Sequence, residues 1–215
     1  MRTVGEPVLI SYEGIEESGK TTHSKRLYRF LQEKGLPVVW TFEPGGDALL
    51  QRVRKYLLEE AGDLPAFAEL FVFLADRSLH MERVIEPALE RGNIVIVDRF
   101  IDSTSAYQGY GRGIDLALIR QLNNLVTGYR KPDLTVLIDI PGEMAARRLA
   151  IRQERDRIED EDIAFFERVR QGFLRQAQED PQRFLVLDGL APILQNELRA
   201  RERALGVLRA KGWKV

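Results

Sequence analysis

A glycine-rich stretch near the N-terminus constrains this chain more than any other feature. Residues 14–21 read Gly-Ile-Glu-Glu-Ser-Gly-Lys-Thr, which matches the pattern G-x-x-x-x-G-K-[ST] of phosphate-binding loops. The apolar residues 8–12 before it predict a buried strand, and a helical pattern follows with Leu27, Phe30 and Leu31 on one face. A chance match in a glycine turn is disfavoured because both flanks agree. We therefore predict a strand, a phosphate loop and a helix in this order.

The loop residues have the chemistry of a polyphosphate site. Successive backbone N–H groups curl round an anion, and the helix N-terminus adds the positive end of its dipole. Gly14 and Gly19 permit turns and close approach that a Cβ would block. We expect Lys20 to reach the β- and γ-phosphates of a nucleotide and the Thr21 hydroxyl to hold Mg²⁺.

Composition excludes several classes of protein. A hydrophobic content of 44% and a charged content of 30% are ordinary for a globular domain, and 215 residues can bury a full core. The net charge of −1 argues against a duplex nucleic-acid binder, and the lack of cysteine excludes disulfides and a thiolate zinc site. Residues 1–7 do not resemble a signal peptide, and no apolar run is long enough to span a membrane. We expect one domain over residues 1–215, located in the cytoplasm, with neither nucleic acid nor membrane as a partner.

Short apolar segments alternate with helical patterns along the chain. The predicted strands are residues 8–12, 38–42, 94–97, 134–140 and 184–187. The predicted helices are residues 20–34, 47–60, 66–90, a segment ending at about 108, 115–127, a segment from 142, 161–178 and 191–210. Strands that are apolar on both faces and separated by helices are typical of a parallel sheet covered on both sides. The expected class is therefore α/β, a three-layer P-loop NTPase fold with five parallel strands and ligands at their carboxyl ends.

Two charged residues end the third predicted strand. Asp98 follows four apolar residues, where an acidic group can hold Mg²⁺ beside Thr21. The alternative for Asp98 is a helix N-cap, because a helix follows. Arg99 would supply fixed positive charge and forked donors to phosphates, and its alternative is a surface ion pair.

Five arginines fall between residues 147 and 157. Alternating charge usually marks a solvated helix face. Because the cluster lies near the expected phosphate end, we favour a closing lid at about residues 147–160, and such lids bring arginine to the transferred phosphoryl group and exclude water. We expect at least one catalytic arginine there.

The helix predicted at 66–90 carries a mixed signal. Leu70, Phe73 and Leu74 have the spacing of plain core residues. Arg77 lies one turn after Phe73, and an aromatic plane beside an arginine would suit a nucleobase. Tyr107 and Gln108 stand in a similar position after Asp98, whereas we interpret the isolated His23 and His80 as non-functional.

These motifs together resemble the bacterial thymidylate kinases, a family of P-loop nucleoside monophosphate kinases, over nearly the whole chain. Five motifs match in order: Glu13-Gly14 at the loop, Glu43-Pro44-Gly45-Gly46, Phe73-Leu74-Ala75-Asp76-Arg77, Asp98-Arg99-Phe100 with Ser103, Ala106, Tyr107, Gln108 and Gly109, and Asp156-Arg157-Ile158-Glu159 with Phe165-Phe166-Glu167-Arg168-Val169-Arg170. The resemblance implies transfer of the γ-phosphoryl group of ATP to dTMP, giving dTDP and ADP, with Mg²⁺ as cofactor. It also implies a homodimer, for which the apolar helix at 66–90 is a plausible interface.

The resemblance also implies roles for individual residues. The implied catalytic residues are Lys20, Arg99, Arg152, Asp98 and Glu16. The implied ATP contacts are Gly14, Ile15, Glu16, Glu17, Ser18, Gly19, Lys20, Thr21 and Thr22, with Thr21 and Asp98 at the metal. The implied acceptor contacts are Glu43, Arg54, Phe73, Arg77, Arg99, Ser103, Thr104, Tyr107 and Gln108.

Within the acceptor set the implied tasks differ. Phe73 would stack on thymine, Arg77 would hydrogen-bond the base, and Thr104 and Gln108 would read its edge. Tyr107 would pack near the deoxyribose and disfavour a 2′-hydroxyl, while Glu16 would lie near the 3′-hydroxyl. Arg99 and Arg54 would hold the acceptor phosphate.

The chain departs from the family pattern at Phe42, Asp47, Glu17 and Gln153. Glu17 adds negative charge beside phosphates, which is unfavourable unless it points to solvent or pairs with a lid arginine. Gln153 stands where the lid often has glycine, and Arg152 is the first choice for the catalytic arginine, followed by Arg155 and Arg157. The rival interpretations are a kinase for another acceptor and a nucleotide-binding regulatory protein that has lost transfer, which Glu17 and Phe42 would favour.

Overall fold

A five-stranded parallel sheet forms the centre of the protein in a computed structural model that describes residues 5–152 and 156–215. The strands are β1 (Val8–Glu13), β2 (Val38–Phe42), β3 (Ile94–Asp98), β4 (Leu134–Asp139) and β5 (Phe184–Asp188). Their order is β2-β3-β1-β4-β5, and all four neighbouring pairs run parallel. The predicted strands and sheet class are confirmed. The edge strands β2 and β5 are only half-buried, so the expectation of strands apolar on both faces is wrong for them.

Helices connect the strands at nearly the predicted positions. They are α1 (Lys20–Glu33), α2 (Leu50–Lys55), α3 (Ala66–His80), α4 (Glu86–Glu90), α5 (Ile101–Thr104), α6 (Leu116–Thr127), α7 (Gly142–Leu149), α8 (Ile163–Glu179) and α9 (Ile193–Ala210). Three π-helical stretches, η1 (Tyr56–Glu60), η2 (Met81–Ile85) and η3 (Ser105–Gly111), continue α2, α3 and α5. In the described part of the chain, no helix combines the length and the apolar character needed to cross a bilayer.

The helical segment predicted to end at about residue 108 is longer in the structure, because η3 continues through Gly109 to Gly111. A Cβ at Gly109 would lie 2.4 Å from the Leu116 side chain. The glycine at this position allows η3 and α6 to pack closely, which a local pattern does not distinguish from a turn.

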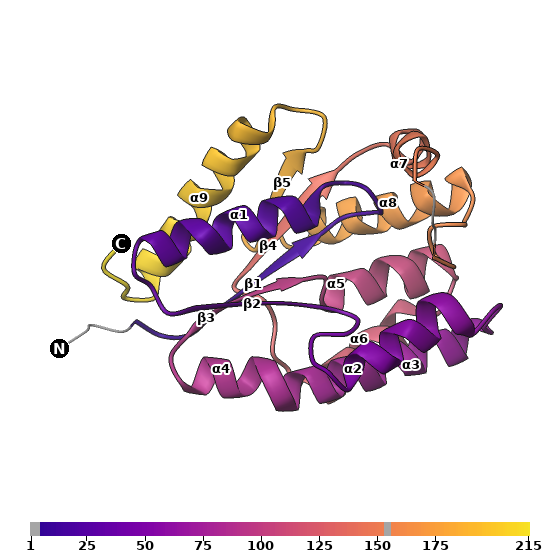
Figure 1. Ribbon diagram of the computed structural model, residues 1–215, viewed down its shortest axis with the longest axis horizontal. Coiled ribbons are helices and arrows are strands. Elements are labelled where there is room, and N and C mark those ends of the chain that lie inside the picture. The colour runs from indigo at the N-terminus through magenta and orange to yellow at the C-terminus, as the bar shows by residue number, and fades with distance from the viewer. Residues whose placement is uncertain (1–4, 153–155) are drawn as a thin grey trace.

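Alternate residues of each strand face two different helical layers. Val8, Ile10 and Tyr12 of β1 pack in one cluster with residues of α1 and α9, whereas Leu9 packs with η2 and α4. Figure 1 shows α1 and α9 over one face of the sheet and α4 on the opposite side. The result is the predicted three-layer arrangement.

The register of the sheet brings the carboxyl ends of β1, β2 and β3 together. Tyr12 of β1 and Phe42 of β2 both stand opposite Asp98 of β3. The Arg99 N–H donates to the Tyr12 carbonyl and the Glu43 N–H to the Asp98 carbonyl, each at 2.9 Å. The residues that follow these strands are therefore brought to one edge of the sheet, where the motifs meet.

Candidate functional site

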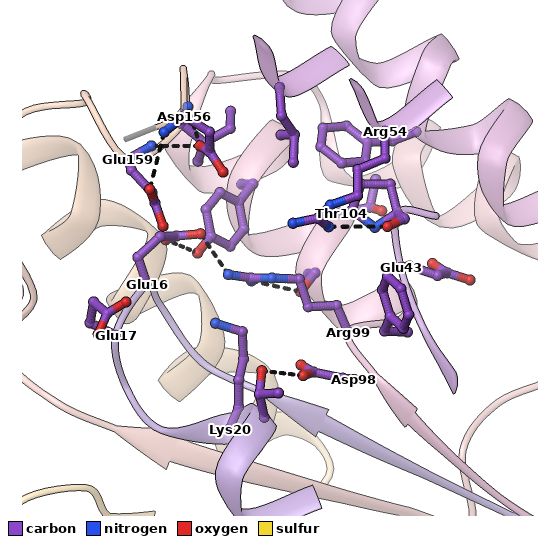
Figure 2. Close-up of a pocket in the computed structure, with 18 of the residues that line it drawn as sticks. Glu16, Glu17, Lys20, Glu43, Arg54, Asp98, Arg99, Thr104, Asp156 and Glu159 are labelled. Carbon is purple, nitrogen blue, oxygen red and sulfur yellow. Dashed lines mark hydrogen bonds and ion pairs between the residues drawn. The ribbon is translucent and has the colours of Figure 1, made fainter. Parts of the chain in front are cut away.

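A cavity of about 640 Å³ lies at the carboxyl ends of β1, β2 and β3. The predicted site residues that line it are Glu16, Glu17, Gly19, Lys20, Thr21, Thr22, Glu43, Arg54, Phe73, Arg77, Asp98, Arg99, Ser103, Thr104, Tyr107, Gln108 and Arg152. Figure 2 shows Lys20 and Asp98 below Arg99, with Asp156 and Glu159 beyond Glu16. Three predicted ATP contacts, Gly14, Ile15 and Ser18, are not among the lining residues, because the Ile15 side chain belongs to the apolar core and Gly14 and Ser18 pack against each other.

The phosphate loop between β1 and α1 requires its glycines. Gly14 has φ +145°, and a Cβ there would lie 2.5 Å from the Ile138 carbonyl oxygen. Gly19 takes φ +93° immediately before α1, so the first turn of that helix faces the cavity. Lys20 donates to the Ile15 carbonyl at 3.1 Å. Burial lowers the pKa of Lys20 to about 8, so an anion in the loop would stabilise its charged form.

Asp98 and Thr21 form the second polar group of the phosphate end. The Thr21 hydroxyl donates to Asp98 Oδ2, and Asp98 Oδ1 is buried without a hydrogen-bond partner in the described part of the chain. A carboxylate oxygen and a hydroxyl are donors that suit Mg²⁺. The capping alternative for Asp98 is wrong, because Phe100 is the N-cap of α5 and no side chain caps that helix.

Arg99 is a largely buried part of the cavity wall, so the alternative of a surface ion pair is wrong. Its Nη2 lies 2.5 Å from Glu16 Oε1, and its Nη1 donates to the Gly14 carbonyl at 3.1 Å. The guanidinium lies 5.0 Å from the ring centre of Tyr107, whose hydroxyl donates to the other Glu16 oxygen. Arg99 also has φ +70°, a backbone conformation that costs about 1 kcal/mol or more and recurs at functional sites.

The arginine-rich segment reaches the phosphate loop through Arg152. Its Nη1 lies 3.1 Å from Glu17 Oε1 and also pairs with Glu159. Of the two arrangements that would make Glu17 tolerable, the structure contains the pair with an arginine of residues 147–160. Arg148 of α7 donates to the Glu17 carbonyl at 2.7 Å, a contact that the sequence pattern did not indicate. Gln153 and Arg155, which the sequence analysis named, lie outside the described residues.

Arg77 is the centre of the opposite end of the cavity. Nε and Nη2 hold Glu43 Oε2 at 2.9 and 2.8 Å. Nη1 donates to Thr104 Oγ1 at 2.5 Å and to Asn123 Oδ1 at 2.7 Å, and Nη2 also donates to the Phe100 carbonyl at 2.9 Å. All five guanidinium N–H groups therefore have acceptors within the protein.

Glu43 is also fully engaged. Its Oε1 lies 2.9 Å from Nδ1 of His80, whose Nε2 contacts the Thr41 hydroxyl at 2.6 Å. Burial would raise the pKa of Glu43, but the Arg77 charge and the His80 contact hold it below its ordinary value. Glu43 therefore holds Arg77 in place, and His80 in turn holds Glu43.

Gln108 meets a second buried carboxylate, Glu69 of α3, at 2.9 Å. Arg112 and Arg157 bind the same carboxylate. Burial would raise the pKa of Glu69, but hydrogen bonds from Arg112, Gln108 and Arg157 hold it below its ordinary value, so the group stays ionised. Sequence analysis did not single out Glu69, although a charged residue inside the apolar stretch of α3 is a signal of a paired, buried group.

Several lining residues were not predicted as contacts: Lys25, Trp40, Phe42, Pro44, Gln51, Leu58, Asp156, Ile158 and Glu159. Arg54 lies 5.9 Å from the ring centre of Phe42 and donates to the Pro44 carbonyl at 3.1 Å. Lys25 lies 4.7 Å from the ring centre of Trp40. Trp40 and Phe42 are two positions apart on β2, so strand periodicity places them on one side and could have indicated this wall.

Comparisons with known proteins agree on one family. A family model described as "Thymidylate kinase" matches residues 12–199. A thymidylate kinase of Sulfurihydrogenibium sp. (strain YO3AOP1) is 46% identical over 187 residues, covering 86% of this chain and 91% of the relative. One from Deinococcus radiodurans is 44% identical over 197 residues, covering 92% and 95%. The crystal structure of thymidylate kinase from Ehrlichia chaffeensis matches with a TM-score of 0.77 and 39% identity, over 93% of this chain and 98% of that one.

Proposed function

The chain belongs to the thymidylate kinase family, and we propose that its cavity is the site where the γ-phosphoryl group of ATP passes to the 5′-phosphate of dTMP, giving dTDP and ADP. One observation carries this assignment. A phosphate loop with Lys20 and a cluster of polar side chains around Arg77 lie at two ends of the same cavity. A single cavity with both ends can align a phosphoryl donor with a nucleotide acceptor.

Catalysis in this proposal is mainly positioning and charge neutralisation, because two anionic phosphates must meet. Lys20 binds the β- and γ-phosphates, and Arg99 and Arg54 bind the acceptor phosphate. Arg99 is held by Glu16 and the Tyr107 ring, so its guanidinium is oriented before substrate arrives. The acceptor phosphate is already an anion, and no general base is required.

Asp98 and Thr21 are the residues that would hold Mg²⁺, which supplies further positive charge to the phosphates. Oδ1 of Asp98 is buried and has no hydrogen-bond partner among the residues that the structure describes, which supports this role. The segment 147–160 would close over both nucleotides as a lid, exclude water and bring Arg152 to the transferred group.

The base end can distinguish thymine by the direction of its hydrogen bonds. Thr104 Oγ1 accepts from Arg77, so its own proton is left to donate to the O4 acceptor of thymine. Phe73, which packs at the edge of the apolar core, offers the plane on which the base stacks. Arg77 then acts on the base through Thr104, and Glu43 acts by holding Arg77.

The sugar lies between these ends in the proposal. The hydroxyl of Tyr107 donates to Glu16. Glu16 is the residue expected near the 3′-hydroxyl, and the Tyr107 ring is expected to disfavour a 2′-hydroxyl. Both side chains line the cavity. A deoxyribonucleotide therefore fits the middle of the cavity better than a ribonucleotide.

We further propose that the enzyme acts in the cytoplasm as a homodimer built on α3. Phe67 and Phe71 of α3 are 52% and 56% exposed, and their ring centres are 6.5 Å apart. Paired exposed aromatic side chains are typical of interfaces. Phe71→Glu should shift the mass measured by sedimentation to that of the monomer, whereas an unchanged mass would place the interface elsewhere.

The decisive experiment is ADP release, coupled to an indicator, with ATP, Mg²⁺ and each of dTMP, dUMP, dCMP, UMP and thymidine. Strong preference for dTMP supports both ends of the cavity. Turnover with another acceptor keeps the phosphate chemistry and overturns the base assignment. Lys20→Ala should abolish transfer, and retained turnover in that variant would contradict the phosphate-loop assignment.

A further inference from the structure

Glu69 is a buried carboxylate that phosphate transfer itself does not use. It lies on α3 and is 0% exposed, next to the core residue Leu70. A lone carboxylate in such surroundings is costly unless several donors hold it. Two separate segments supply those donors: η3 and the residue that follows it, through Gln108 and Arg112, and the lid segment, through Arg157.

Each oxygen of this carboxylate has its own partners. Oε1 accepts from Gln108 Nε2 at 2.9 Å and from Arg112 Nε at 3.2 Å. Oε2 accepts from Arg112 Nη2 at 3.1 Å and lies 2.7 Å from Arg157 Nη1. The ion pair of Arg112 with Glu161 at 2.6 Å adds a second link, to the residue that follows the lid segment. One group therefore holds both a base-reading residue and the lid.

The contact with Glu69 fixes which way the Gln108 amide faces. An ionised carboxylate can only accept, so the amide NH₂ must face Glu69, and the amide oxygen is turned away from it. That oxygen can accept the N3–H of thymine. Cytosine carries an acceptor at N3, so the same orientation would set two acceptors against each other.

We propose, on the premise that the enzyme phosphorylates dTMP, that Glu69 is a positioning residue that sets the preference for thymine over cytosine and links base binding to docking of residues 156–161. A thymine that holds Gln108 also keeps Glu69 in place. Glu69 in turn holds Arg157, which lies in the same segment as Arg152. Because such coupling is reciprocal, an ATP analogue that orders the lid tightens the binding of dTMP more than the binding of dCMP.

The test uses Glu69→Gln, which keeps the size of the side chain and removes its charge. We expect kcat/KM for dTMP to fall about tenfold or more and that for dCMP to change less than about twofold. The matched control is Glu197→Gln, because Glu197 is also buried and paired with two arginines, Arg26 and Arg201, but does not line the cavity. A loss of folding alone would lower kcat/KM equally for both acceptors. The dTMP-to-dCMP ratio of kcat/KM therefore separates an effect on positioning from an effect on stability.

Calorimetry measures the coupling directly. The dTMP dissociation constant is determined with and without a non-hydrolysable ATP analogue in wild type, Glu69→Gln and Arg157→Gln. We expect the analogue to tighten dTMP in the wild type and to have almost no effect in either variant, while Arg157→Gln keeps the thymine preference because Gln108 still meets Glu69. The proposal would be overturned if Glu69→Gln kept the wild-type dTMP-to-dCMP ratio of kcat/KM and if the ATP analogue still tightened its binding of dTMP.

Arg157→Gln also keeps the proposal testable if the Glu69 variant does not fold. Intact coupling in Arg157→Gln would overturn the proposal by itself, because the lid would then dock without its bond to Glu69. A wild-type enzyme that does not prefer dTMP would instead contradict the proposed function, so the two failures are distinguishable.

Discussion

Glu17 of the phosphate loop and Arg152 of the arginine-rich segment form an ion pair, with 3.1 Å between Oε1 and Nη1. The pair joins the phosphate loop to the arginine-rich segment, the two parts of the chain that we propose contact the nucleotide phosphates. Both side chains are partly exposed, so the attraction between them is worth only about 0–1 kcal/mol. A pair this weak holds Arg152 near the loop and would give way to a phosphate.

We first predict the effect of removing the Glu17 charge. Glu17→Gln should lower KM for ATP by about two- to fivefold, because ATP no longer has to displace a carboxylate from Arg152 and no longer faces its charge. Steady-state kinetics at saturating dTMP measure the change. Glu202→Gln, an exposed carboxylate of α9, is the control. A raised KM would mean that the pair helps to order the lid for ATP instead of competing with it.

A second prediction concerns Arg152 itself. Arg152→Ala should lower kcat by about 100-fold or more, since a guanidinium aimed at the transferred group acts mainly in the transition state. ATP binding should weaken much less, by less than about fivefold, as expected for the loss of a half-exposed contact. Single-turnover kinetics and ATP titration separate the two effects. Arg147→Ala, at an exposed position of α7, should leave both unchanged. Full turnover in Arg152→Ala would move the assignment to Arg157 or Arg155.

The phosphate end of the site could be predicted from sequence because its determinants are local. The loop pattern lies within eight consecutive residues, from Gly14 to Thr21. The apolar residues before Asp98 indicate that this residue ends a strand. The same holds for the sheet, whose strands are set by short apolar runs. The bounds of the edge strands β2 and β5 were also predicted, but their exposure was not, since exposure at an edge depends on strand order, which local patterns do not contain.

The base end could be predicted only as a set of residues, without its partners. Arg77 was expected to touch a base, yet its donors are taken by Glu43, Thr104 and Asn123, which come from distant parts of the chain. Glu69 was missed for the same reason, because its importance lies in partners brought by tertiary packing. Hydrogen-bond direction, which decides what Thr104 can offer, follows only when these partners are known.

A third prediction tests the proposed metal site. Asp98→Asn should raise the Mg²⁺ concentration needed for half-maximal velocity by about tenfold or more, because an amide oxygen is a weaker ligand than a carboxylate for a hard cation. Velocity is measured against total Mg²⁺ at fixed ATP. Asp115→Asn, which alters a carboxylate that caps α6, should show the wild-type Mg²⁺ dependence. An unchanged Mg²⁺ requirement in Asp98→Asn would remove Asp98 from the metal site.

The last prediction concerns stability and rests on Asp76, whose Oδ1 accepts from the Gly45 N–H at 3.0 Å. Burial, followed by the charge of Glu43, raises the pKa of Asp76 from 3.8 to about 7, against the opposing effects of the Gly45 hydrogen bond, His80 and Arg77. Between these two pKa values the folded state binds more protons at this group than the unfolded state does. The contribution of Asp76 to stability is therefore full below about pH 4 and is lost as pH rises through about 7.

The amide side chain that Asp76→Asn introduces cannot lose a proton in this pH range, but its oxygen can still accept a hydrogen bond from the Gly45 N–H. The new NH₂ group takes the place of Oδ2, which is buried and has no hydrogen-bond partner among residues 5–152 and 156–215. This mismatch costs the same free energy at every pH, so the informative quantity is the slope and not the offset. The free energy of unfolding of the variant relative to wild type should rise by about 2 kcal/mol between pH 5 and pH 8. Urea denaturation at several pH values measures it, with Asp115→Asn, which alters the carboxylate that caps α6, as the control. A difference that stays constant with pH would mean that Asp76 remains ionised throughout and that Arg77 and His80 neutralise it more strongly than its burial opposes.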